Sequence, residues 1–400
     1  MTEKKEASSK RTGQINLVII TFAHMFNHTF MRMHQALVPI FRSELNLDWF
    51  TVSLMSSIPL TFQALMSVPS GMLADRFNHR YLVSISIILC ATAAVMVSQA
   101  QSVYLLIISL SILAFSSTFY HPAAFSFTSE LFDTSQRNKA LGIHGAGGTF
   151  GTSIGPITLG LLMVYIGWRN VYLLWAVPIS IFAFLVFTKL KTETFRRHEK
   201  SEFVNNNNLK KSASIKSVLS RELLILLSVI GISSFGTQAL SPYMTSYFSD
   251  VRGMPIGLST ILFGLVSTMG LLSAPIGGYF ADKLGEKKWL TITFIGILLS
   301  ISGVALSSSI YFLVIFYLLN GFFQFAGMAA NSSLVASFTP KSRRGLGYGL
   351  FFLPTNLVGS VSPLVSSVIV SNFGIWYVFP LAFGIYLVAT LLLQAMPTKR

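Results

Sequence analysis

The chain of 400 residues is 52% hydrophobic, only 11% of its residues are charged, and its formal net charge is +15. Because a soluble domain carries about a quarter charged residues, this composition argues against a soluble protein and indicates one embedded in a membrane. The positive charge does not point to a nucleic acid, since the basic residues are spread over many short segments between apolar stretches. The expected partner is the lipid bilayer, whose anionic headgroups favour basic loops.

Apolar stretches of about 20 residues without an acidic or basic side chain are long enough to cross a bilayer as helices. In chain order, one helix is expected in residues 12–41, one in 49–74, two in 81–129, one each in 140–168, 170–188, 223–249 and 253–281, and two each in 289–340 and 345–398. The first span is interrupted by a charge at Arg32. The sequence therefore predicts an all-α membrane protein with twelve transmembrane helices.

A short motif recurs after the second and the eighth of these spans. Gly71 begins the sequence Gly-x-x-x-Asp-Arg, and Gly278, 207 residues later, begins Gly-x-x-x-Asp-Lys. The repeat indicates that one membrane unit has been duplicated. It predicts two pseudo-symmetric six-helix bundles, residues 15–188 and 222–396. Duplicated membrane halves with a site between them are typical of transporters.

The remaining segments are polar and are expected to face the cytoplasm. Residues 1–14 and 397–400 form the two tails, and residues 189–221 form a linker between the bundles. With this orientation 25 of the 29 Lys and Arg residues are cytoplasmic. Such an asymmetry follows the positive-inside rule and predicts a multi-pass protein of the cell membrane with both termini in the cytoplasm.

These motifs resemble those of the major facilitator superfamily. The resemblance rests on the two copies of the loop motif and on Gly151-x-x-x-Gly155-Pro156 in the fifth helix, which is similar to the motif of the antiporter branch. Within the superfamily the chain looks most like the fosmidomycin-resistance type of efflux protein. The matching stretches are Phe22-Ala-His24-Met-Phe-Asn27, Tyr120-His121-Pro122 and Gly147–Pro156. The resemblance implies the major facilitator fold, alternating access and proton-coupled efflux, which confers drug resistance in that type.

The chain departs from the fosmidomycin-resistance pattern at two positions. His28 and Ala123 stand where that type carries an acid. Both changes remove candidate proton carriers, and no acid remains near the middle of any span. Histidine is then the group that titrates near neutral pH.

The loop motif is the expected gate at the cytoplasmic side. The gating residues are Gly71, Asp75, Arg76, Arg80, Gly278, Asp282 and Lys283. The glycines would allow helices to approach closely, and the acids would accept hydrogen bonds from a helix N-terminus or pair with a basic residue. In the alternative interpretation the basic residues only hold the loops inside. In the fifth helix, Gly151, Gly155 and Pro156 predict tight packing and a kink, whose role is either mechanical or purely structural.

The candidate substrate and proton site lies mainly on the first helix. His24, His28, Arg32 and Gln35 follow helical spacing and share a face. An unpaired Arg within a span is costly, so this face is expected to line a water-filled cavity. Alternatively, Arg32 reaches the outer surface and His28 makes a neutral helix contact.

Other polar residues within the spans complete the candidate site: Asn27, Tyr120, His121, His144, Gln238, Asn320, Gln324 and Asn356. Tyr120 and His121 are expected to point to different faces. His24 and His28 have the spacing of a metal-binding pair, but no acid or Cys accompanies them nearby, so no metal and no cofactor is expected.

The sequence thus predicts a monomeric secondary transporter and not an enzyme, since no catalytic constellation is present. It would move a small organic solute, expected to be an anion, outward in exchange for protons. Uptake or facilitated diffusion of a small organic anion is the alternative. A further alternative is a membrane sensor that transports no solute.

Overall fold

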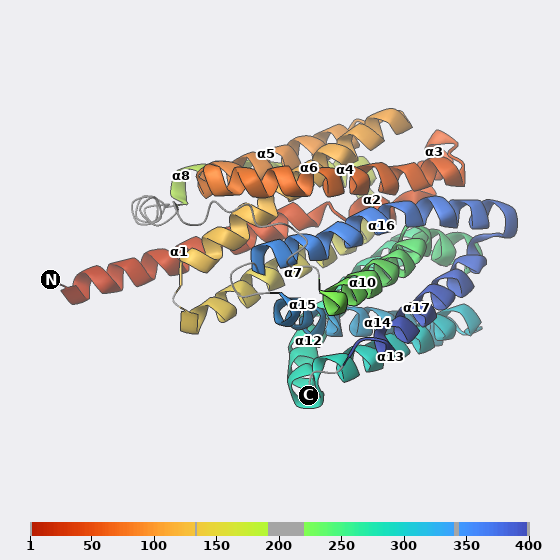
Figure 1. Ribbon diagram of the computed structural model, residues 1–400. Coiled ribbons are helices and arrows are strands. Elements are labelled where there is room, and N and C mark those ends of the chain that lie inside the picture. The colour runs from red at the N-terminus through yellow and green to blue at the C-terminus, as the bar shows by residue number, and fades with distance from the viewer. Residues whose placement is uncertain (1, 133, 191–219, 340–343, 398–400) are drawn as a thin grey trace.

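The computed structural model describes residues 2–132, 134–190, 220–339 and 344–397, and this part of the chain is almost entirely helical (Figure 1). The first bundle consists of α1 (Thr2–Thr29), α2 (Met33–Ala36), α3 (Val38–Leu45), α4 (Trp49–Arg76), α5 (His79–Ser98), α6 (Val103–Glu130), α7 (Thr134–Ile166) and α8 (Trp168–Lys189). The second consists of α10 (Arg221–Leu240), η3 (Ser241–Tyr243), α11 (Met244–Ser246), η4 (Tyr247–Val251), α12 (Ile256–Leu284), α13 (Glu286–Leu306), α14 (Ile310–Ala326), α15 (Met328–Phe338), α16 (Arg344–Phe373), η6 (Ile375–Tyr377) and α17 (Val378–Gln394).

The predicted all-helical membrane fold is confirmed. Eleven segments of the described chain are long and apolar enough to cross a membrane. They coincide with all the predicted spans except the first. The first span is present as α1, α2 and α3 in succession, and its breaks and polar side chains set it apart from the other eleven.

Two helices are broken at corresponding places in the two bundles. The first breaks between Thr29 and Met33, and the seventh changes to a 3-10 turn at Ser241, directly before Pro242, and to a π-turn beyond it. Proline cannot donate a backbone hydrogen bond, which explains the second break. The short α2 packs against η3 and α11, so the two breaks meet where the bundles meet.

The bundles touch along two seams, α7 against α12 and α4 against α16. In the first seam Gly160 faces Gly257, so closely that a Cβ on Gly160 would lie 2.4 Å from the Gly257 carbonyl oxygen. Near the same end of the molecule, Arg42 of the first bundle lies 3.8 Å from Asp250 of the second. We call this the closed end.

The opposite end carries the two copies of the loop motif, and we call it the motif end. A Cβ added to Gly71 or Gly278 would meet nothing within 4 Å, and Asp282 is exposed. The close helix approach predicted at these two glycines is therefore absent from this conformation. The bundles are in contact at the closed end, whereas the two motif glycines make no close contact in the described structure.

Three further predicted gate residues lie at the motif end, whereas the side chain of Asp75 lies outside the described part of the structure. Arg76 and Lys283 are exposed, and the Arg80 guanidinium lies 4.9 Å from the centre of the Phe187 ring. The gating role of the motif stays a prediction.

The predicted packing of the fifth helix is present. In α7 the glycines at 147, 151 and 155 lie against α1, and a Cβ on Gly151 or Gly155 would come within 2.1 or 1.9 Å of a carbonyl oxygen, of Met25 or Thr29. Pro156 follows within the same continuous helix. Only glycine allows the backbones of α1 and α7 to approach this closely.

Two helix ends lie close to the predicted linker, residues 189–221, whereas the first helix begins before the predicted boundary at residue 15. Helix α8 ends at Lys189, and α10 begins at Arg221. Most of the predicted linker, residues 191–219, lies outside the described residues, as do residues 398–400 of the C-terminal tail. Residues 2–14 of the predicted N-terminal tail continue α1 as helix. The division into these segments stays a prediction.

We predict that Gly151→Ala lowers the apparent melting temperature of the detergent-purified protein, by an amount equivalent to about 1–3 kcal/mol, because the new methyl group forces α1 away from α7. The matched control is Gly145→Ala in the same helix, where a Cβ would meet nothing within 4 Å. Alanine stabilises a helix relative to glycine, so this control should melt at the same temperature or slightly higher. Equal melting temperatures for the two variants would contradict the packing argument.

Candidate functional site

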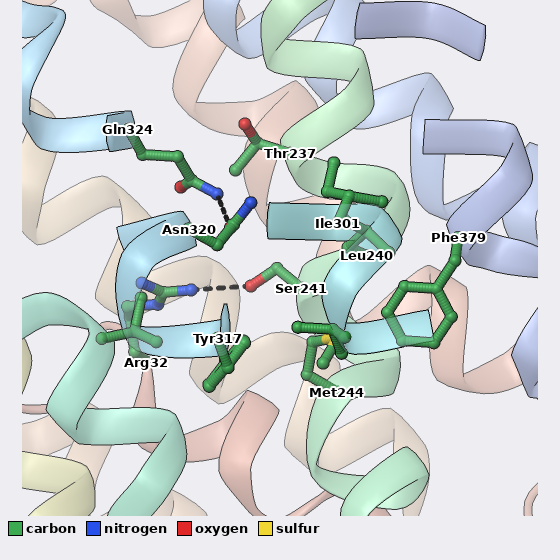
Figure 2. Close-up of a pocket in the computed structure, with 12 residues that line it drawn as sticks. Arg32, Thr237, Leu240, Ser241, Met244, Ile301, Tyr317, Asn320, Gln324 and Phe379 are labelled. Carbon is green, nitrogen blue, oxygen red and sulfur yellow. Dashed lines mark hydrogen bonds between the residues drawn. The ribbon is translucent and has the colours of Figure 1, made fainter. Parts of the chain in front are cut away.

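A pocket lies where the two broken helices meet (Figure 2). Its walls come from α10, η3, α11, α12, α13, α14 and α17 of the second bundle. Among the described residues, Arg32 is the only lining residue that the first bundle contributes. The cavity has a volume of ≈ 30 Å³, which is room for about two water molecules or a similarly small solute.

The Arg32 guanidinium is held by groups of the opposite bundle. It donates one hydrogen bond to the Ser241 hydroxyl over 2.8 Å and another to the Ser267 hydroxyl over 3.2 Å. Its central carbon lies 4.7 Å from the centre of the Phe263 ring, within the range of a cation–π contact. Ser241 in turn donates to the side-chain oxygen of Gln35, 2.9 Å away. These contacts hold the charge in the seam between the bundles.

Among the residues that the structure describes, no carboxylate neutralises this charge. In the described part of the chain, Arg32 forms no ion pair, and its hydrogen-bond acceptors are the two serine hydroxyls. Arg32 is only partly buried and faces the pocket. A positive charge that is desolvated and lacks a partner is costly, so it favours an anion in the pocket.

Amides of α14 complete the polar side of the pocket. The side-chain amide of Gln324 donates to the oxygen of Asn320, and Asn320 donates to the Ser300 hydroxyl over 3.0 Å. The other amide groups expected in the site lie elsewhere. Gln238 lies beside Gly359, and neither it nor Asn356 lines the pocket.

A second polar cluster lies within the first bundle. The His24 ring stacks on His144 and Tyr120, with ring centres 4.3 and 5.2 Å apart, and meets the edges of His28 and His121 at 4.6 and 5.3 Å. Tyr120 and His121, which were expected to point to different faces of their helix, both contact the His24 ring from α1. The structure thus joins all four candidate histidines from three helices.

The predicted common face of the first helix is divided by the helix break. His24 and His28 lie together before the break, whereas Arg32 and Gln35 lie after it and meet through Ser241. Asn27 is fully buried and donates to the hydroxyls of Ser86 and Ser116, both at 3.2 Å. It ties α1 to α5 and α6 and does not line the pocket.

Sequence reasoning missed Ser241, Ser267 and Tyr317, which contact Arg32 or line its pocket. Serine and tyrosine are too frequent in the spans to be singled out by type. One signal was available for Ser241, because Ser241-Pro242 interrupts the seventh helix within two residues of the position that corresponds to Arg32 in the first. Interrupted helices at corresponding positions of two repeats mark binding sites in transporters.

Comparisons with known proteins agree on the family. The model of the family described as Major Facilitator Superfamily matches residues 20–309 and 262–399. A solved structure of a bacterial homologue of the human lysosomal transporter Spinster, in an inward-facing and occupied conformation, is similar with a TM-score of 0.79 over 95% of this chain and 96% of that chain. At 15% identity this likeness shows the fold alone.

The curated relatives carry names that refer to different solutes. The chain is 27% identical to the nitrite extrusion protein of Bacillus subtilis over 66% of its length, and 27% identical to a probable nitrate/nitrite antiporter of Thermus thermophilus over 67%. These matches span 64% and 60% of the two relatives. It is also 24% identical to the fosmidomycin resistance protein of Escherichia coli, over 72% of this chain and 70% of that protein.

We predict that Arg32→Gln, without any added ligand, leaves the melting temperature unchanged or raises it, by up to about 2 kcal/mol in stability, because it removes a charge that has no partner. The control is Arg169→Gln. Arg169 pairs with Glu44 at 2.8 Å and also bonds the Ala100 carbonyl, so its loss should lower stability by up to about 1 kcal/mol. A larger destabilisation by Arg32→Gln than by Arg169→Gln would show that the charge is satisfied internally.

Proposed function

The chain belongs to the Major Facilitator Superfamily of transporters, and on that premise we propose that it carries a small anion across the cell membrane by alternating access between its two bundles. The protein is a multi-pass membrane transporter and not an enzyme. The nature of the solute, the direction and the coupling are the parts that the proposal adds. The proposed direction is efflux in exchange for protons.

One observation carries the choice of an anion. The Arg32 guanidinium faces a pocket between the bundles and donates to neutral hydroxyls only. A cationic solute would meet an unscreened positive charge there, whereas an anion supplies the missing partner and accepts charge-assisted hydrogen bonds. The names of two relatives, which refer to nitrite and nitrate, support the same chemistry.

Alternating access is supported by the contacts of Arg32 themselves. They run from the first bundle to Ser241 and Ser267 of the second, so a solute that binds Arg32 competes with contacts that hold the two bundles together. Placing the motif end at the cytoplasm, as the basic residues favour, makes this conformation open to the inside. Rocking of the bundles would then close the loop motif and separate Gly160 from Gly257.

Protons are assigned to the histidine cluster because, in the described part of the chain, the acids of the spans lie near their ends and none lies near the middle. His28 precedes Arg32 by four residues, across the helix break, and its two ring nitrogens contact Thr152 and His121. An anion at Arg32 would favour a proton on His28, and release of the anion would favour its loss. Efflux is favoured over uptake by the Gly151-x-x-x-Gly155-Pro156 motif and by relatives named for extrusion and resistance.

The proposal is tested in proteoliposomes loaded with nitrite, nitrate, a short phosphonate or a short carboxylate, with a lipophilic cation and a neutral sugar as negative arms. We expect counterflow of at least one anion and of neither negative solute. Arg32→Gln should reduce that counterflow at least about tenfold, since it removes hydrogen bonds to a charged group. Transport of the cation, or anion counterflow unchanged in Arg32→Gln, would sink the proposed anion site.

Proton coupling is tested in the same vesicles with a pH gradient. His28→Ala should abolish anion flux driven by the gradient and leave counterflow, because counterflow needs no net movement of protons. The intact counterflow serves as the control for folding and anion binding. Flux driven by the gradient that survives in His28→Ala would remove His28 from the coupling mechanism.

A further inference from the structure

Three histidines place ring nitrogens around one point inside the first bundle. His24 and His28 come from α1, and His121 comes from α6. One ring nitrogen of each lies within 4.8 Å of the other two. His24 is 5% exposed, and the other two are partly buried. The sequence suggested only the pair on α1, and the third member becomes visible when α6 packs beside it.

Hydrogen bonds to neighbouring groups fix which nitrogen of two of these rings is free to bind. His24 donates from Nδ1 to the His144 carbonyl oxygen, 2.7 Å away. The Thr152 hydroxyl donates its proton to the Gly148 carbonyl oxygen, so its oxygen can only accept from the His28 Nδ1, at 3.1 Å. Both Nε2 atoms therefore carry a lone pair.

This pattern is the one that metal-binding histidines show. A ligating imidazole usually donates its second nitrogen to a carbonyl or another acceptor, which orients the ring and fixes its tautomer. The Nε2 of His24 is buried and has no hydrogen-bond partner in the described part of the chain. Buried polar atoms normally have a partner, so this unused lone pair is available to bind an ion.

The distances suit a small cation. Two nitrogens bound at 2.0–2.1 Å in tetrahedral geometry lie about 3.3 Å apart, and the Nε2 atoms of His28 and His121 lie 3.3 Å apart. Because the His28 Nε2 carries a lone pair, the His121 Nε2–H donates its proton to it. The Nδ1 of His121 is buried without a described partner. Moving that proton to Nδ1 gives three converging lone pairs. The third nitrogen, from His24, lies within 4.8 Å of the other two.

We propose that His24, His28 and His121 form a binding site for one late first-row divalent cation, of the class of Co²⁺, Ni²⁺ and Zn²⁺. Three imidazoles suit these ions, and they leave a fourth position for water or an anionic oxygen. The cation and protons compete for the same lone pairs, so metal binding would suppress proton coupling through His28. The inference does not depend on the anion site or on the direction of transport.

The test is a titration of Co²⁺ into detergent-purified protein that carries no histidine tag, followed by visible absorption. We expect one Co²⁺ per chain, with the intense absorption band of a four-coordinate site, and its displacement by Zn²⁺. His28→Gln and His121→Gln should each weaken binding at least about tenfold. The matched control is His79→Gln, at the start of α5, where the ring contacts Phe127 outside the cluster. It should bind as the wild type does.

Wild-type protein that binds no Co²⁺ or Zn²⁺ at millimolar concentration overturns the proposal without any variant. Equal binding by the wild type, His28→Gln and His121→Gln also overturns it, because the metal would then lie elsewhere. If a variant cannot be purified, the stoichiometry and band shape of the wild type decide. None of these readings involves transport, so failure of the metal site leaves the proposed anion function untouched, and failure of transport leaves the binding result standing.

Discussion

The Arg32 charge is held at the junction of two broken helices, and the arrangement of the pocket depends on it. The partly buried guanidinium loses part of its hydration, and two serine hydroxyls with one aromatic face replace only some of what is lost. A break in the first helix before Arg32 lets the side chain reach into the second bundle. The break in the seventh helix supplies Ser241 to meet it.

Glycine packing on the other side of the first helix makes this placement possible. The glycines of α7 let α1 approach its backbone, and Gly148 leaves room for the His24 ring, since a Cβ there would lie 2.5 Å from that ring. The same contact brings Thr152 to His28. The glycine motif of α7 therefore positions the histidine cluster directly.

Much of the fold could be predicted from apolar lengths, basic loops and the repeat, because bilayer thickness and charge asymmetry act on the sequence directly. Which of the candidate residues come together in the site could not be predicted from the sequence. Helical spacing placed Arg32 and His28 on one face, but the break after Thr29 separates them into two surroundings. Convergence of Tyr120 and His121 on His24 depends on how α6 packs against α1. Asn27 was expected to bind the solute because of its amide side chain, but this side chain bonds to two neighbouring helices instead.

The most direct test of the account is ligand-induced thermal stabilisation of the detergent-purified protein, compared between wild type and Arg32→Gln. A ligand at 100 times its dissociation constant adds about 2.7 kcal/mol of stability, which a melting curve detects. The account predicts that small anions stabilise the wild type, that cations and sugars do not, and that Arg32→Gln loses the effect. Stabilisation by cations alone, or by anions equally in both proteins, would contradict the claim that Arg32 supplies the counter-charge of the transported solute.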